Sequence, residues 1–152
     1  MKFANEDFWM FWNEARGSGL FEKHYDEINL NKAIKLDPAD DLYFALYKMG
    51  MMEAHTMRDD KGVLVGYSVY YVQPHMHYKK SLTATNDILF VRKDCRRGLA
   101  GYKFLKYTVD EIKKRKPQRI FFHVKPHHDF GRLLERLGAK AFETMYSINL
   151  EV

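Results

Sequence analysis

A short basic stretch in the second half of the chain has the residue types that bind an anion. Four basic side chains precede two glycines there: Arg92, Lys93, Arg96, Arg97, Gly98 and Gly101. A strand pattern leads into the stretch, and a helical pattern follows it directly. Backbone N–H groups at a helix start lack partners within the helix and attract phosphate, and glycine lets a ligand approach the backbone closely. The stretch therefore predicts a phosphate site, although its spacing matches neither GxGxxG nor GxxxxGK[ST].

The seven histidines raise the separate question of a metal site. His75 and His77 have the spacing of a chelate on a strand, and three more histidines lie within residues 123–128. The sequence has neither HExxH nor paired CxxC, so we expect no metal and place His75 and His77 at a rim or surface. The only cysteine, Cys95, lies among basic residues, which lower the pKa of a thiol, so it is a candidate reactive group.

Length and composition suit one small domain. The chain has 152 residues, 46% of them hydrophobic, and we treat residues 1–152 as one domain. A single cysteine cannot form an internal disulfide, which favours the cytoplasm. The N-terminus lacks the apolar run of a signal peptide, and no run reaches the ~20 residues of a membrane span. The formal charge of +5 suits an anionic ligand, but no RNA-binding signature is present, and we do not expect nucleic acid.

Hydrophobic periodicity predicts the elements that must position these residues. We expect the first fifty residues to be helical, with one helix that Asp37 caps and that buries Leu42, Ala45, Leu46 and Met49. Further helices are predicted near 102–112 and 130–137, and strands at 52–58, 63–72, 83–91, 119–124 and 141–150. The predicted aromatic core residues are Phe8, Trp12, Tyr67, Tyr70, Phe121 and Phe142. The order predicts an α/β fold of the α+β kind, with a mixed sheet and helices packed on it.

Three stretches of the sequence form a set: Val65-Gly66-Tyr67 with residues 74–78, the basic stretch, and residues 123–138. Together they resemble the GNAT superfamily of N-acetyltransferases. The likeness runs from about residue 52 to the C-terminus and is closest to small acetyltransferases encoded by bacteriophages. It implies a mostly antiparallel sheet with one parallel, splayed pair of strands and helices on both faces.

The pyrophosphate loop of that family reads R/Q-x-x-G-x-G/A. Arg96 and Gly101 match its first and last positions but leave Leu99 at the middle glycine. A shift by one residue restores Gly98 and Ala100 and places Cys95 at the arginine. Either alignment therefore departs from the family pattern at one position.

The resemblance also implies how acetyl-CoA would bind. It would lie between strands 83–91 and 119–124, with pantetheine on the backbone of the first strand and one N–H group polarising the thioester carbonyl. Arg92, Lys93 or Arg97 would reach the remaining phosphate. The expected cofactor-binding residues are Leu89, Phe90, Val91, Arg96, Arg97, Gly98, Leu99, Ala100, Gly101 and Tyr102.

Two proton transfers follow from the same resemblance. The family's glutamate base aligns with Thr85, and Asp87, two residues later on the same face, is the expected base. Asp87 also fits a carboxylate that only bonds to backbone where the strands diverge. Leu134 occupies the position of the family's tyrosine acid, so His127 becomes the candidate acid, unless His128 acts or the thiolate leaves unaided.

We therefore expect an N-acetyltransferase that transfers acetyl from acetyl-CoA to a primary amine by direct attack on the thioester. The acceptor is a protein lysine, an N-terminus or a small amine, with Tyr71, His75, Tyr78 and Tyr146 beside it. The alternative is a non-catalytic protein of the same fold that contacts a host protein or nucleic acid, which Leu134 and the altered loop favour. The phage likeness implies a host cytoplasm, and the family likeness implies a homodimer through edge strands.

Overall fold

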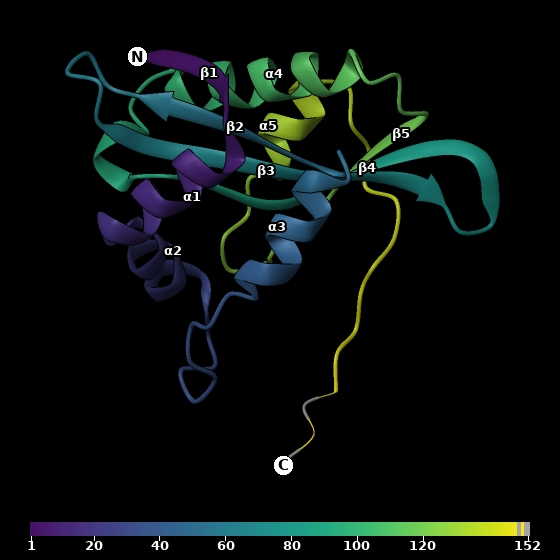
Figure 1. Cartoon of the computed structure of the whole chain (residues 1–152), viewed down its shortest axis with the longest axis horizontal. Coiled ribbons are helices and arrows are strands. Elements are labelled where there is room, and N and C mark those ends of the chain that lie inside the picture. The colour runs from purple at the N-terminus through teal and green to yellow at the C-terminus, as the bar shows by residue number, and fades with distance from the viewer. Residues whose placement is uncertain (149, 151–152) are drawn as a thin grey trace.

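The computed structural model describes residues 1–148 and 150 and contains one five-stranded sheet (Figure 1). The strands are β1 (Lys2–Glu6), β2 (Met52–Arg58), β3 (Leu64–His75), β4 (Tyr78–Val91) and β5 (Arg119–Phe122). The helices are α1 (Phe8–Gly17), α2 (Leu20–Ile28), α3 (Asp40–Lys48), α4 (Ala100–Lys113) and α5 (Gly131–Arg136), with a 3-10 turn at Lys93–Cys95. The strand order is β1-β2-β3-β4-β5, and only the β4–β5 pair is parallel. The predicted mixed sheet, with one parallel pair and helices packed on it, is confirmed.

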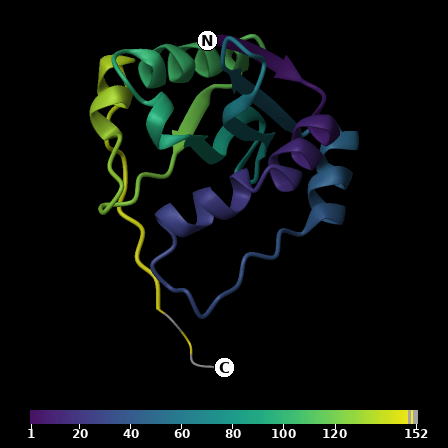
Figure 2. The same cartoon turned by 90° about the vertical axis from the view of Figure 1, so that its left-hand side faces the viewer.

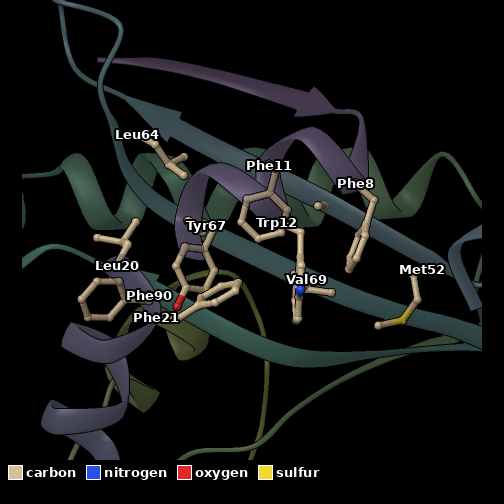
Figure 3. Close-up of a cluster of buried hydrophobic side chains, with 12 residues drawn as sticks. Phe8, Phe11, Trp12, Leu20, Phe21, Met52, Leu64, Tyr67, Val69 and Phe90 are labelled. Atoms are coloured by element: carbon tan, nitrogen blue, oxygen red, sulfur yellow. The ribbon is translucent and has the colours of Figure 1, made fainter. Parts of the chain in front are cut away.

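Helices cover both faces of the sheet (Figure 2). On one face, α1 and α2 bury an aromatic cluster against β2, β3 and β4, in which Phe8, Phe11 and Tyr67 have no exposed surface (Figure 3). On the other face, Phe104 and Ile112 of α4 pack on β2, β3 and β4. Burying a large apolar side chain contributes about 1.5–3 kcal/mol, so these two layers supply most of the driving force for folding.

The N-terminal half shows both the strength and the limit of periodicity. Helix α1 begins at Phe8 because Asp7 accepts a hydrogen bond from the Met10 N–H, and the predicted stripe from Phe8 to Ala15 is buried. The helical prediction was wrong for Lys2–Glu6, which forms β1 against β2. This segment is a strand because it pairs with β2, about fifty residues along the chain. The local spacing of apolar residues carries no information about such a distant partner.

Helix α3 also differs from the prediction. It begins at Asp40 after Ala39, so Asp37 is not its cap. The carboxylate of Asp40 instead accepts hydrogen bonds from the Trp12 indole and the Arg16 guanidinium. Leu42 and Met49 are exposed, while Tyr43, Leu46 and Tyr47 pack on the aromatic cluster. Of the predicted stripe, only Leu46 packs inward, and Ala45 is exposed as well. The contacts of Asp40 and the two tyrosines with distant parts of the chain decide which face of the helix is buried.

The end of the chain departs furthest from the expectation. Residues 141–148 and 150 form neither helix nor strand, and the predicted core residue Phe142 is 69% exposed. The other expected aromatic core residues, Phe8, Trp12, Tyr67 and Tyr70, are buried, and Phe121 is half-buried. Within the described residues, no helix is long and apolar enough to cross a membrane.

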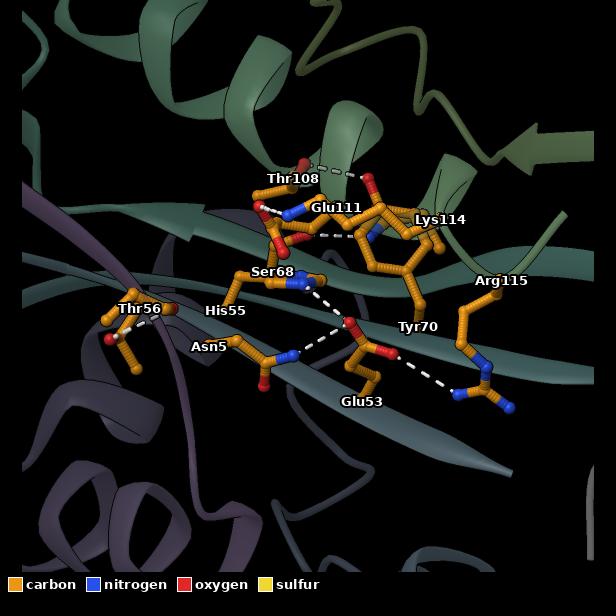
Figure 4. Close-up of polar contacts among 12 residues, drawn as sticks. Asn5, Glu53, His55, Thr56, Ser68, Tyr70, Thr108, Glu111, Lys114 and Arg115 are labelled. Atoms are coloured by element: carbon orange, nitrogen blue, oxygen red, sulfur yellow. Dashed lines mark hydrogen bonds and ion pairs between the residues drawn. The ribbon is translucent and has the colours of Figure 1, made fainter. Parts of the chain in front are cut away.

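A polar network links β1, β2 and the end of α4 on the sheet face that α4 covers (Figure 4). The carboxylate of Glu53 accepts hydrogen bonds from the side chains of Asn5 at 2.9 Å, His55 at 3.0 Å and Arg115 at 3.2 Å. Burial by itself raises the pKa of Glu53, but the bonds from His55 and Arg115 outweigh it and the pKa is lowered. Glu53 therefore stays ionised in the folded protein.

We expect Glu53→Gln to remove part of the acid dependence of stability. The lowered pKa stabilises the native state above the ordinary value of 4.5, and this contribution is lost as the pH falls through the folded value. At neutral pH the loss is on the order of 1–2 kcal/mol, because the charged acceptor of the buried His55 ring is removed. Urea unfolding from pH 3 to 7 measures it. Glu143→Gln, at an exposed carboxylate, is the control, and equal pH profiles for both variants would contradict this assignment.

Candidate functional site

The parallel strands β4 and β5 separate part of the way along β4. They pair from Thr83↔Arg119 to Asn86↔Phe122, whereas β4 continues to Val91. On the β3 side, Val69 pairs with Ile88 but Tyr70 pairs with Asn86, so Asp87 is an extra residue. Such a β-bulge bends its strand and increases the local twist. The backbone of residues 87–91 therefore has an edge without a strand partner, here called the open edge of β4.

The side chain of Asn86 holds this bulge. Its amide nitrogen lies 2.9 Å from the Ser68 hydroxyl, 3.1 Å from the Val69 carbonyl and 3.2 Å from the Ile88 carbonyl, and Asn86 is buried. It thus bonds to backbone oxygens of both strands at the bulge, β3 and β4. Asn86 is not among the residues predicted from the sequence, although a lone amide within a strand pattern is a signal of such a role.

Alternation along β4 determines which backbone groups face the open edge. The Arg92 N–H donates to the Val65 carbonyl at 2.7 Å, so the backbone groups of Phe90 and Ile88 also point toward β3. Those of Leu89 and Val91 point toward the open edge. Of the predicted pantetheine-binding residues, Leu89 and Val91 therefore offer backbone groups there, and Phe90 offers a ring that stacks on His24.

The basic loop after β4 presents unpaired N–H groups, as a phosphate site requires. Among the described residues no acceptor pairs with the amides of Arg97, Gly98, Leu99, Gly101 and Tyr102. Gly98 has φ +61°, a left-handed conformation that favours glycine, and α4 starts without a side-chain cap. The Ala100 amide bonds to the Arg97 carbonyl and closes the turn. The five free amides and the positive end of α4 favour an anion at this point.

Arg96 has a different role from its neighbours. Its guanidinium bonds to both carboxylate oxygens of Glu27 on α2 and to the Val91 carbonyl, and it lies over the Phe90 ring. This pair lowers the pKa of Glu27. The Arg96 side chain therefore fixes the loop against α2 and the open edge. An open hollow beside the loop is lined by Lys23, Arg92, Lys93, Asp94 and Arg97, and Arg92 bonds there to both carboxylate oxygens of Asp94.

A second cavity of about 400 Å³ lies on the aromatic face, next to the bulge. Trp12, Phe21, Tyr43, Tyr67, Ile88 and Lys125 contribute to its lining, together with residues between α2 and α3. His24 is hydrogen-bonded to the Tyr67 hydroxyl at 2.7 Å, and burial lowers its pKa to about 4, so it is neutral at pH 7. Tyr71, His75, Tyr78 and Tyr146 are not among the lining residues, and His75 and Tyr78 lie at the β3–β4 turn.

Asp87 and Thr85 lie where β4 leaves β5. The Asp87 carboxylate is exposed and accepts a hydrogen bond from the Tyr43 hydroxyl at 2.6 Å, and burial together with this contact raises the pKa of Tyr43. Thr85 is half-buried between Tyr71 and Phe121 in the strand register. Asp87 thus reaches the cavity lining through Tyr43, a partner on α3 that no spacing in the sequence indicated.

The remaining candidates contact α2 or are buried. His127 is exposed and bonds to the Ile28 carbonyl at 3.0 Å, while His128 lies 3.2 Å from Glu27. Leu134 is buried in α5. Cys95 is buried, and burial raises the pKa of its thiol, which corrects the expectation of a reactive group. In the part of the chain that is described, no three His, Cys, Asp or Glu residues are grouped as metal ligands.

The sequence matches no protein-family model and no curated protein, but the fold has relatives among solved structures. One is a ribosomal-protein-alanine N-acetyltransferase from Brucella melitensis biovar Abortus 2308, with 19% identity, a TM-score of 0.67 and coverage of 99% of this chain and 100% of that one. A glucosamine-6-phosphate N-acetyltransferase from Arabidopsis thaliana has 10% identity, a TM-score of 0.71 and coverage of 99% and 98%. A transcriptional regulator from Bacillus halodurans C-125 has 15% identity, a TM-score of 0.74 and coverage of 98% and 99%. The chain thus has the fold of GNAT acetyltransferases.

We expect Asn86→Ala to loosen the bulge. Removing the amide leaves the Val69 and Ile88 carbonyls without their side-chain donor, at a cost of about 1–3 kcal/mol in the free energy of unfolding. Amide hydrogen exchange at residues 87–89 should accelerate more than exchange elsewhere in β4. Asn5→Ala is the control, because that amide makes one exposed hydrogen bond. Unchanged exchange at residues 87–89 in folded Asn86→Ala would show that the bulge does not depend on Asn86.

Proposed function

We propose that this protein is an N-acetyltransferase that transfers acetyl from acetyl-CoA to a primary amine. The observation that carries the proposal is the open edge of β4, which ends at a loop with five unpaired backbone amides. A long ligand with an amide-bearing arm and a pyrophosphate needs both features in this order. The fold shared with known acetyltransferases supports the same reading.

The residues of the chain fit this ligand. Backbone groups of Leu89 and Val91 would bind the pantetheine arm, and the amides between Arg97 and Tyr102 would bind the pyrophosphate. Arg97, Lys93 and Lys23 would neutralise the remaining phosphate from the basic hollow. Arg96, Phe90 and Ala100 would support the site, since Arg96 already bonds to Glu27 and to the Val91 carbonyl.

The cavity beside Asp87 is the proposed acceptor site. A volume of about 400 Å³ accommodates a small amine or a single lysine side chain. Its walls include Trp12, Tyr43 and Tyr67, and aromatic faces attract organic cations. An amine would therefore enter in its protonated form and must lose a proton before it can attack.

Asp87 is the proposed base. It lies at the bulge, and the hydrogen bond from Tyr43 orients its carboxylate beside the cavity. Acetyl-CoA supplies an activated carbonyl carbon, to which the amine nitrogen bonds as the carbon–sulfur bond breaks. Asp87 takes the proton that the bound ammonium loses before the attack. The second proton, which the nitrogen loses as the amide forms, passes to solvent, and the leaving sulfur is protonated from His127 or solvent. Thr85, two residues before Asp87 on β4, lies on the same face of the sheet.

The structure supports His127 as the acid less strongly than Asp87 as the base. Its ring bonds to the Ile28 carbonyl, so it must leave that contact to act as an acid. Leu134 is buried at the position where the resembling family carries tyrosine, and it cannot donate a proton. This absence favours the alternative function, a protein that kept the fold and acts by contact. Binding of acetyl-CoA separates the two functions.

We expect Gly101→Trp to abolish cofactor binding without unfolding the protein. A Cβ atom at Gly101 meets nothing within 4 Å, so the indole extends into the space beside the free amides. Calorimetric titration with acetyl-CoA should show micromolar affinity for the natural chain and at least a tenfold loss for the variant. Gly17→Trp is the matched control, because Gly17 also has open space around it. Equal affinity in all three proteins would refute the loop as the pyrophosphate site, and no binding to the folded natural chain would favour the contact function.

A second variant tests the base. Asp87→Asn retains an acceptor for the Tyr43 hydroxyl but cannot take a proton, so turnover should fall by roughly 100-fold with unchanged affinity for acetyl-CoA. Thiol release in the presence of an amine panel, from pH 6 to 10, measures this effect. Tyr43→Phe is expected to reduce turnover less, because it only removes the group that orients Asp87. Turnover equal to that of the natural chain across the pH range would exclude Asp87 as the base.

A further inference from the structure

The cavity proposed for the acceptor is rich in aromatic rings. Trp12, Phe21 and Tyr67 belong to the aromatic cluster of Figure 3, and Tyr25 and Tyr43 add rings from α2 and α3. The volume of about 400 Å³ lies in the range of pockets that enclose small-molecule ligands. Rings pack favourably against one another, so these walls suit an acceptor with an aromatic body.

The polar atoms of these rings already have partners within the protein. The indole and hydroxyl groups pair as follows: Trp12 with Asp40, Tyr25 with the Ile34 carbonyl, Tyr43 with Asp87, and Tyr67 with His24. A body rich in hydroxyl groups, such as a sugar, would lose its water between the rings and gain few hydrogen bonds in return. The walls therefore disfavour a sugar and favour an aromatic group.

Charged side chains of both signs border the same cavity. Lys35 and Asp37 lie on the connection between α2 and α3, and Lys125 lies in the loop after β5. The carboxylate of Asp87 is linked to the cavity through Tyr43. Within the described part of the chain, none of these four charges has an ion-pair partner. A ligand that carries both a positive and a negative charge complements this set better than a simple amine does.

Lys125 and Asp87 reach the cavity from the same end of the parallel strand pair. Asn86↔Phe122 is the last pair of β4 and β5, so Asp87 directly follows the paired region on β4, and Lys125 follows it on the other strand. The Lys125 ammonium lies 3.4 Å from the carbonyl of Ile28, which also lines the cavity. An anionic and a cationic side chain thus come from adjoining segments, as an amine next to a carboxylate requires.

We propose that the acceptor is a free aromatic amino acid. Its amine would lie toward Asp87, its carboxylate at Lys125 and Lys35, and its ring between the aromatic walls. A lysine side chain or a protein N-terminus has no carboxylate beside its amine and would leave both lysines of the cavity unpaired.

This inference rests on the proposed acetyltransferase function. Transfer would form a carbon–nitrogen bond as the carbon–sulfur bond of acetyl-CoA breaks. The ammonium nitrogen loses two protons and the sulfur gains one. The products are therefore an N-acetylamino acid, the CoA thiol and one proton.

Three ligands that differ by one group test the assignment: L-phenylalanine, L-phenylalanine amide and L-alanine. Calorimetric titration at pH 6, where the amines are protonated, measures their affinity without turnover. Phenylalanine should bind at least tenfold more tightly than either of the others, because the amide lacks the carboxylate and alanine lacks the ring. Equal affinity for the amide would point to a peptide N-terminus and overturn the proposal. Equal affinity for alanine would overturn the role of the rings.

Two variants test the carboxylate site. Lys125→Gln and Lys35→Gln should each lower the affinity for phenylalanine at least fivefold and leave the affinity for its amide unchanged. Lys61→Gln, at the exposed turn between β2 and β3, is the matched control and should bind phenylalanine like the natural chain. Natural affinity for phenylalanine in both cavity variants would refute the site.

Thiol release from acetyl-CoA separates this inference from the proposed function. Phenylalanine should release thiol faster than its amide or alanine. Turnover of other amines without turnover of phenylalanine would overturn the amino acid assignment and leave the acetyltransferase function intact. If acetyl-CoA does not bind at all, the proposed function fails, and the calorimetric preference among the three ligands alone decides whether the cavity is an amino acid site.

Discussion

The local structure of the site depends on one interruption of backbone pairing, the bulge at Asp87. Because β4 carries one residue more than β3 at this point, it turns away from β5 after Asn86 and keeps an unpaired edge up to Val91. Unpaired backbone groups in a sheet require another partner, which makes such an edge a binding surface. The same bulge directs Asp87 toward Tyr43. The proposed cofactor and acceptor sites therefore meet at the residue that creates the bulge.

Helix α2 joins the loops on both sides of the open edge. Glu27 bonds to Arg96 in the loop before α4 and lies 3.2 Å from His128 in the loop after β5. The Ile28 carbonyl, at the end of the same helix, accepts a hydrogen bond from His127. Positive groups near a helix C-terminus are favoured by its dipole. The N-terminal helices thus form one wall of the proposed acceptor cavity and also support the loops of the proposed cofactor site.

Three buried or partly buried polar groups interrupt the apolar core of this fold. Asn86, the His24–Tyr67 pair and the bonds around Glu53 all connect separate elements. Two of these three groups lie at the proposed site: Asn86 holds the bulge, and His24 lines the proposed acceptor cavity. A polar group in a core is costly unless it is satisfied, so such positions suit geometry that apolar packing alone cannot define.

The sequence by itself determined the elements whose causes are local. Helix α1, strands β3 and β4 and the glycine-bearing loop before α4 follow from side-chain spacing, capping and turn chemistry. Together with the family likeness, these elements predicted the fold. Strand β1 and the buried face of α3 depend on partners far along the chain, which periodicity does not report. The C-terminal residues 141–148 and 150 have a strand pattern but form no strand. The role of Arg96 shows the same limit. Its position in the loop was evident from the sequence, but only tertiary structure brought Glu27 to it across sixty-nine residues.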